Sequence, residues 1–246
     1  MVVWAAVSIA AAVALLGGCA GTKSGAGAGA TSPSSVEESP RRLVAERSAS
    51  RALHGDDLIL DLSPAAEILT LWLEPTEAVR ARARAIATDL PYQTLRHYYS
   101  MMMSCVPSDE EVTRAIAVPD SGICGFGLGS AYQERASVDS LVRALVLRGS
   151  AIRKRVAADV GIYAPDWPWK PVRIYFVIAT RYLFDAVTLD RGLDGSGPTV
   201  IFNLSEALNY GGSTEERLAI VERVLAHETF HAVLRQVEYG KPGWER

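Results

Sequence analysis

The stretch VLAHETFHAVL, residues 224–234, holds two of the chain's four histidines, His227 and His231, with Glu228 directly after the first. In an α-helix, residues four apart differ by about 40° around the axis and about 6 Å along it. Both imidazoles can therefore reach one metal ion at about 2.0 to 2.1 Å. The spacing predicts a metal site on one face of a helix.

The surrounding sequence predicts the bounds of this helix. Ser213 and Glu216 have the spacing of a capping box, which favours a helix start at Thr214. The helix is expected to continue to Tyr239, because Gly240 is typical of the position just after a helix end. The apolar residues that flank the motif are Leu218, Val221, Val224, Leu225, Val233, Leu234 and Val237. They predict a buried, central helix.

The glutamate between the histidines suggests catalysis. Beside His227, Glu228 can lie near a metal without binding it, accept a proton from a water molecule and pass that proton to a departing amine. The alternative is a pair of core histidines that other groups satisfy. Residues 224–233 carry no charge other than Glu228, and buried polar groups without partners are costly. This favours the metal site.

The segment His227-Glu228-Thr229-Phe230-His231 resembles the HExxH motif of the zincin metallopeptidases. The resemblance implies Zn²⁺ as cofactor, His227 and His231 as its ligands, Glu228 as general base, and a peptide or protein substrate. It also implies that Thr199 to Leu204 is the edge strand on which an extended peptide is laid. From Asp56 onward the chain is loosely similar to bacterial predicted zinc-dependent proteases.

The residues after the motif distinguish the branches of this family. Metzincins continue with Gly three and His six residues after the second histidine, where this chain has Leu234 and Val237. In gluzincins the third ligand is a glutamate on a later helix. The pattern is therefore gluzincin-like, with a third ligand still to be found.

Two glutamates follow the motif, and neither suits the role of third ligand. Glu238 lies seven residues after His231, or about 10 Å along the helix. Glu245 could reach the metal only if the chain folded back. We therefore expect the third ligand beyond Arg246, with the catalytic region incomplete in this sequence.

Composition narrows the function classes. The 246 residues are 49% hydrophobic and 22% charged, which is ordinary for a globular chain with a core. The formal net charge is -3 and the isoelectric point is about 5.9, so no basic field attracts nucleic acid. Small molecules and polypeptides remain as partners.

The N-terminus indicates export. The apolar run from Val2 to Leu16 is too short to span a bilayer but suits a signal peptide, assigned to residues 1–18. Leu16-Gly17-Gly18-Cys19 resembles a bacterial lipobox, which implies lipidation of Cys19 and a membrane anchor at the cell envelope. An ordinary cleavage site near Ala20 is the alternative, because no Lys or Arg precedes Lys23.

The remaining chain divides into three predicted regions. Residues 19–55, rich in Gly, Ala and Ser, are assigned to a flexible tether. Residues 56–164 are assigned to a helical region, and residues 165–246 to a zincin-like catalytic region. The expected fold class is α+β, with a mostly helical N-terminal half and a small sheet packed on the long motif helix.

Several local signals refine this α+β prediction. Helices are expected from Ser63-Pro64, from Thr76, after Pro91, and at a capping box formed by Ser108 and Glu111; two more should meet at Gly149-Ser150. Strands are expected at 172–178 and 199–204, as an antiparallel or loosely connected pair. An exported chain favours a disulfide between Cys105 and Cys124 over two buried thiols.

Two hypotheses follow from the sequence. The first is an exported, lipid-anchored zinc metallopeptidase. The second is a non-catalytic envelope lipoprotein whose helical part binds a partner and whose motif is a relic or a structural metal site. Glu228 favours the first, because a structural site has no use for a carboxylate that binds no metal.

The lipid anchor is testable by fractionation. Replacing Cys19 with alanine removes the only residue that the lipobox would modify, so the protein should move from the membrane fraction into the soluble fraction. The measurement is immunoblotting of both fractions beside the wild-type chain. Unchanged partitioning would leave only an ordinary signal peptide.

Overall fold

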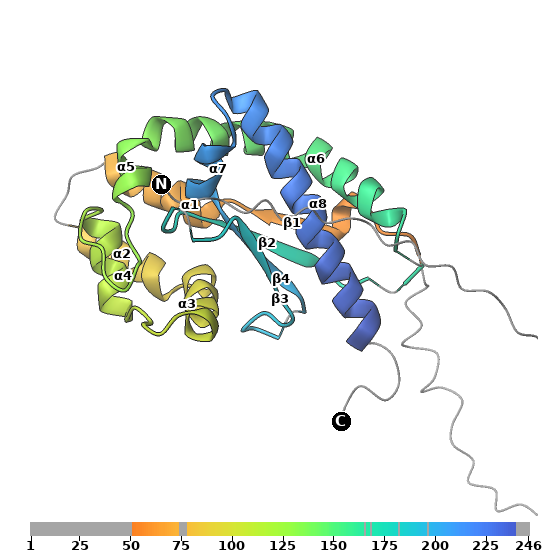
Figure 1. The fold of residues 1–246 in the computed structure, drawn as a ribbon, viewed down its shortest axis with the longest axis horizontal. Coiled ribbons are helices and arrows are strands. Elements are labelled where there is room, and N and C mark those ends of the chain that lie inside the picture. The colour runs from red at the N-terminus through yellow and green to blue at the C-terminus, as the bar shows by residue number, and fades with distance from the viewer. Residues whose placement is uncertain are drawn as a thin grey trace, which may run out of the picture. The chain divides into compact units, whose positions relative to one another are not determined.

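We describe the fold from a computed structural model, which describes residues 51–73, 78–164, 166–167, 169–181, 183–195 and 197–239. The architecture is α+β, as predicted (Figure 1). Its strands are β1 (Leu58–Asp61), β2 (Val172–Val177), β3 (Ala186–Leu189) and β4 (Thr199–Asn203). Its α-helices are α1 (Ser63–Leu73), α2 (Val79–Thr88), α3 (Leu90–Met102), α4 (Asp109–Ala117), α5 (Gly129–Gln133), α6 (Arg135–Gly161), α7 (Leu204–Ala207) and α8 (Thr214–Tyr239). Two short 3₁₀ helices are Gly55–Asp57 and Leu208–Tyr210.

The four strands form one mixed sheet in the order β1-β2-β4-β3. β1, β2 and β4 are parallel, and β3 is antiparallel to β4. The predicted antiparallel pairing of the two long strands is therefore wrong. The connection between them contains β3, which pairs with the far side of β4 and leaves β2 and β4 running in the same direction.

The position of β4 also corrects the expected edge strand. All five residues of β4 are buried, and the strand lies between β2 and β3. The edge of the sheet on this side is β3. A peptide cannot pair with the segment from Thr199 to Leu204, because β2 and β3 already occupy both of its sides.

The N-terminal boundary of the folded part differs from the predicted regions. β1 lies within the segment assigned to helices and pairs with β2, so both predicted regions contribute to one sheet. Residues 51–55, assigned to the end of the tether, are also packed: Leu53 is 6% exposed, and Arg51 exchanges backbone hydrogen bonds with Trp167. Residues 51–55 therefore belong to the folded part rather than to a tether.

Helix α6 is continuous where two helices were predicted. Gly149 and Ser150 lie within it, so the predicted break is wrong. A glycine inside a helix costs about 1 kcal/mol relative to alanine. Leu145 and Ile152, on either side of this position, are fully buried, and burying such side chains contributes about 1.5 to 3 kcal/mol each. Packing therefore outweighs the local preference.

Helix α8 has the predicted bounds. The Ser213 hydroxyl accepts a hydrogen bond from the Glu216 N–H, and the Glu216 carboxylate accepts one from the Ser213 N–H at 3.0 Å, as the capping box requires. Figure 1 shows α8 running beside α6. Two arginine-glutamate pairs join these helices, Arg148 with Glu215 and Arg155 with Glu222. These exposed pairs add little to stability, so apolar burial holds the helices together.

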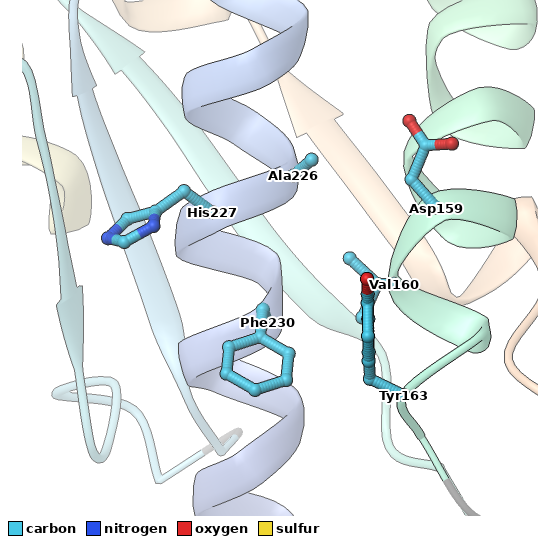
Figure 2. A pocket seen from close by; sticks show the side chains of 6 residues that line it. All are labelled: Asp159, Val160, Tyr163, Ala226, His227 and Phe230. Carbon is cyan, nitrogen blue, oxygen red and sulfur yellow. The ribbon is translucent and has the colours of Figure 1, made fainter. Parts of the chain in front are cut away.

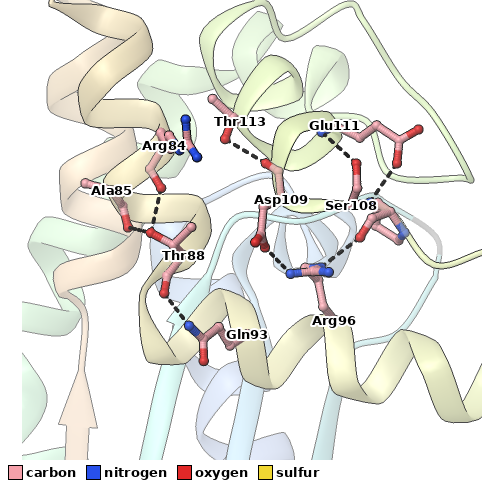
Figure 3. A network of polar contacts seen from close by, with 10 residues as sticks. Arg84, Ala85, Thr88, Gln93, Arg96, Ser108, Asp109, Glu111 and Thr113 are labelled. Carbon is pink, nitrogen blue, oxygen red and sulfur yellow. Dashed lines mark hydrogen bonds and ion pairs between the residues drawn. The ribbon is translucent and has the colours of Figure 1, made fainter.

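A polar network connects α3 and α4 (Figure 3). Ser108 and Glu111 form the predicted capping box at the start of α4. Arg96 of α3 donates to the Pro107 carbonyl at 2.7 Å and pairs with Asp109. In the neighbouring loops Cys105 and Cys124 are joined as a disulfide, with Cα atoms 5.3 Å apart.

The residues predicted to form the signal peptide, together with Cys19, lie outside the described residues. Within the described ranges, no helix is long and apolar enough to cross a membrane.

Tyr92 provides a test of the packing between α3 and the sheet. Its side chain is fully buried, and its hydroxyl donates to the Ile178 carbonyl at 2.8 Å and accepts from the Ile178 N–H at 3.3 Å. Tyr92→Phe leaves both backbone groups buried without this partner, which should lower the free energy of unfolding by about 1 to 3 kcal/mol. Urea denaturation measures the change. Tyr163→Phe is the control, because Tyr163 is 75% exposed; equal effects would contradict the prediction.

Candidate metal centre

The two motif histidines lie on the same face of α8. Their Nε2 atoms are 3.1 Å apart and their ring centroids 4.6 Å apart. Two nitrogens that bind one zinc ion tetrahedrally at about 2.05 Å are separated by about 3.3 Å. The observed separation is close to this value, and it is also that of a hydrogen bond between the two rings. The spacing is therefore compatible with both nitrogens binding a single ion.

The prediction that α8 is a buried, central helix is wrong for the face that carries the histidines. The His227 side chain is 68% exposed, and His231 is also exposed. Helix α8 is buried only on its other side, where Val221 and Leu225 are fully covered. Because water can hydrate these histidines, a lone histidine pair would carry no large desolvation cost. The exposure leaves room for further ligands and for a substrate.

Glu228 lies beside the pair but turns toward the sheet. Its side chain is only 12% exposed, and Oε1 lies 4.0 Å from the His227 Nε2 atom. The Thr188 hydroxyl, on β3, is 2.7 Å from the Glu228 Oε2 atom and 3.0 Å from the Glu228 carbonyl oxygen. Its single proton can be donated to either acceptor. Thr188 thus attaches the edge strand to the carboxylate.

A groove runs between β3 and α8 past the candidate site. One pocket, of about 490 Å³, is lined by Asp185, Ala186, Ile220, Arg223, Val224, His227 and Glu228. A second, of about 260 Å³, is lined by Ala186, Val187, Thr188, Glu228, His231 and Arg235. Ala186 and Glu228 belong to both, so the two pockets adjoin at Glu228. The groove therefore brings a bound molecule to both histidines and to the carboxylate.

Two tyrosines, Tyr98 and Tyr210, interact electrostatically with acidic residues that line this groove. Burial raises the pKa of Tyr98, and the negative charge of Glu228 raises it further. Burial also raises the pKa of Tyr210, with a further contribution from Asp185. Both phenols therefore stay protonated at neutral pH and contribute no negative charge to the site.

Among the described residues, no side chain lies beside the two histidines as a third candidate ligand. Within the part of the chain that the structure describes, no group of three or more His, Cys, Asp and Glu side chains is placed to hold a metal ion. Glu238 pairs with Arg235 at 3.1 Å instead. Glu245 lies outside the described residues. The described chain thus brings together two histidines and a carboxylate.

The sequence did not predict strand β3 or the contact of its Thr188 with Glu228. The strand reads Ala-Val-Thr-Leu between Asp185 and Asp190, and its β-branched Val187 and Thr188 were the available signal. Four residues are too few to show a clear alternation. Thr188 could not be linked to Glu228 without knowing that β3 lies against α8.

Comparison with known proteins gives no relative for this chain. No family model matches it, and neither a curated protein nor a solved structure does so.

The contact between Thr188 and Glu228 is testable by a double-mutant cycle. Hydrogen bonds to charged groups contribute about 1.5 to 3 kcal/mol, and we expect less here because the single proton of the Thr188 hydroxyl can go to either of two acceptors. We expect Thr188→Val and Glu228→Ala to show a coupling energy of about 1 kcal/mol in urea denaturation. Thr188→Ser should keep most of it. Additive single effects would mean that the two side chains do not interact.

Proposed function

We propose that this chain is an exported zinc-dependent metallopeptidase that binds zinc through His227 and His231 and uses Glu228 as general base. The observation that carries the proposal is the 3.1 Å separation of the two Nε2 atoms, with the Glu228 carboxylate held beside them. Each feature alone is common on a helix surface. Their combination at a groove is what a hydrolytic site requires.

His227 and His231 would hold the zinc ion, which would supply Lewis-acid chemistry that lowers the pKa of a water molecule toward neutrality. Glu228 is the group that accepts this proton and returns it to the leaving amine. Thr188 holds the Oε2 atom of the carboxylate on the β3 side, while the Oε1 atom lies 4.0 Å from the His227 Nε2 atom. This arrangement supports the roles assigned to Glu228 and the histidines.

The edge strand β3 is the proposed place for the substrate backbone. It pairs with β4 on one side and forms the edge of the sheet on the other. A peptide in extended form can add to such an edge through main-chain hydrogen bonds. Because Thr188 of β3 contacts Glu228, a peptide held there lies close to the base.

The second candidate is a non-catalytic envelope lipoprotein in which the motif is a relic or a structural metal site. The exposure of the His227 side chain, 68%, and the lack of a third ligand among the described residues favour it. The two candidates share the proposed signal peptide and lipid anchor at Cys19. They differ in whether Glu228 acts on a bound peptide.

Zinc binding and hydrolysis separate these candidates. We expect the whole chain to bind zinc weakly, because two imidazoles leave the remaining positions to water. His227→Ala or His231→Ala should abolish this binding. Glu228→Gln should keep the zinc affinity, because it removes no ligand, but should lower any peptide hydrolysis by a factor of about 100 or more. Calorimetry measures zinc, and a library of fluorogenic peptides measures hydrolysis.

His54→Ala is the matched control, since His54 is an exposed histidine just before the 3₁₀ helix Gly55–Asp57 and outside the groove lining. It should change neither zinc affinity nor hydrolysis. Zinc binding that survives both motif substitutions would contradict the metal site. Zinc binding without hydrolysis at any peptide would favour the non-catalytic lipoprotein.

A further inference from the structure

An apolar pocket lies on the opposite side of His227 from the groove. It has a volume of about 330 Å³ and is lined by Asp159, Val160 and Tyr163 from α6 and the residues after it, and by Ala226, His227 and Phe230 from α8 (Figure 2). This size is at the low end for small-molecule sites. It therefore suits one side chain better than a large ligand.

Two aromatic rings form one wall of this pocket. The rings of Tyr163 and Phe230 meet edge to face with centroids 6.2 Å apart. Tyr163 is 75% exposed, and Phe230 is partly buried. Such a wall offers apolar area and, through the ring faces, attraction for a cation.

Asp159 is the only acidic residue in the lining. In the described ranges, no hydrogen bond or ion pair engages its carboxylate, which is exposed at the rim (Figure 2). The carboxylate therefore gives an otherwise apolar pocket one negative charge, with which an occupant that carries a positive charge at its end can pair.

We propose that this pocket binds the side chain of a lysine or arginine of a polypeptide. The methylene stem lies against Tyr163 and Phe230, and the cation lies against Asp159. Long basic side chains combine these two properties, an apolar stem and a charged end. Acidic and short polar side chains are disfavoured, because the first are repelled by Asp159 and the second leave the aromatic wall uncovered.

His227 connects this pocket to the candidate metal centre, because it lines both the pocket and the groove beside β3. A residue whose side chain fills the pocket therefore has its backbone next to the histidine pair. If the chain is a peptidase, as proposed above, it should prefer substrates with a basic residue near the bond that is cleaved. The binding of a basic side chain in the pocket does not depend on that proposed function.

The test uses binding to the metal-free whole chain, followed by NMR at Tyr163 and Phe230. Three ligands are compared: the N-acetyl methylamides of lysine, arginine and norleucine, the last having a similar stem without charge. Exposed ion pairs contribute modestly, so we expect the two basic ligands to bind about threefold more tightly than norleucine at low salt. High salt should remove this advantage.

Asp159→Asn should make the three affinities equal, while Ala226→Leu, which fills the pocket, should weaken all three. Asp139→Asn is the matched control, because Asp139 is on α6 outside the pocket lining. Equal binding of lysine and norleucine to the wild-type chain, or an advantage that survives Asp159→Asn, would overturn the proposal. Selective lysine binding in a chain that binds no zinc would support the pocket and overturn the proposed hydrolase.

Discussion

The two-sided character of α8 is the constraint on which the rest of the structure depends. One side buries Leu218, Val221 and Leu225 against the sheet and α6. These apolar positions fix the rotation of the helix about its axis. Once that rotation is fixed, His227 and His231 must face solvent, and Glu228 must lie at the boundary, where β3 can reach it. Apolar packing thus determines the chemistry that the opposite face can offer.

The sequence was most informative where a signal is local. The capping boxes at Ser108 and Ser213 predicted the starts of α4 and α8, because both partners lie within four residues. The spacing of His227 and His231 predicted a shared face for the same reason. Helix geometry alone relates these residues, and no distant contact can alter that relation without breaking the helix.

The sequence was least informative where distant contacts decide the structure. β1 is four residues long and becomes a strand because β2 lies beside it. The parallel pairing of β2 and β4 depends on β3 folding back to the outer side, which no turn motif specifies. At Gly149, the local tendency to end a helix was outweighed by the buried side chains of α6. The exposure of the histidines was missed for a related reason, since the apolar count of α8 does not reveal which face is covered.

In the proposed zinc site, the position of Glu228 relative to the histidines limits what the metal could do. A carboxylate free to rotate would compete for the open metal positions, because carboxylates also bind zinc. Thr188 opposes this by holding Oε2 on the β3 side, 2.7 Å from its hydroxyl. In the proposed zinc site, the short edge strand would therefore have a role beyond completing the sheet. It would keep the Glu228 carboxylate next to the histidines and leave the remaining coordination positions to water, to a further ligand or to a substrate.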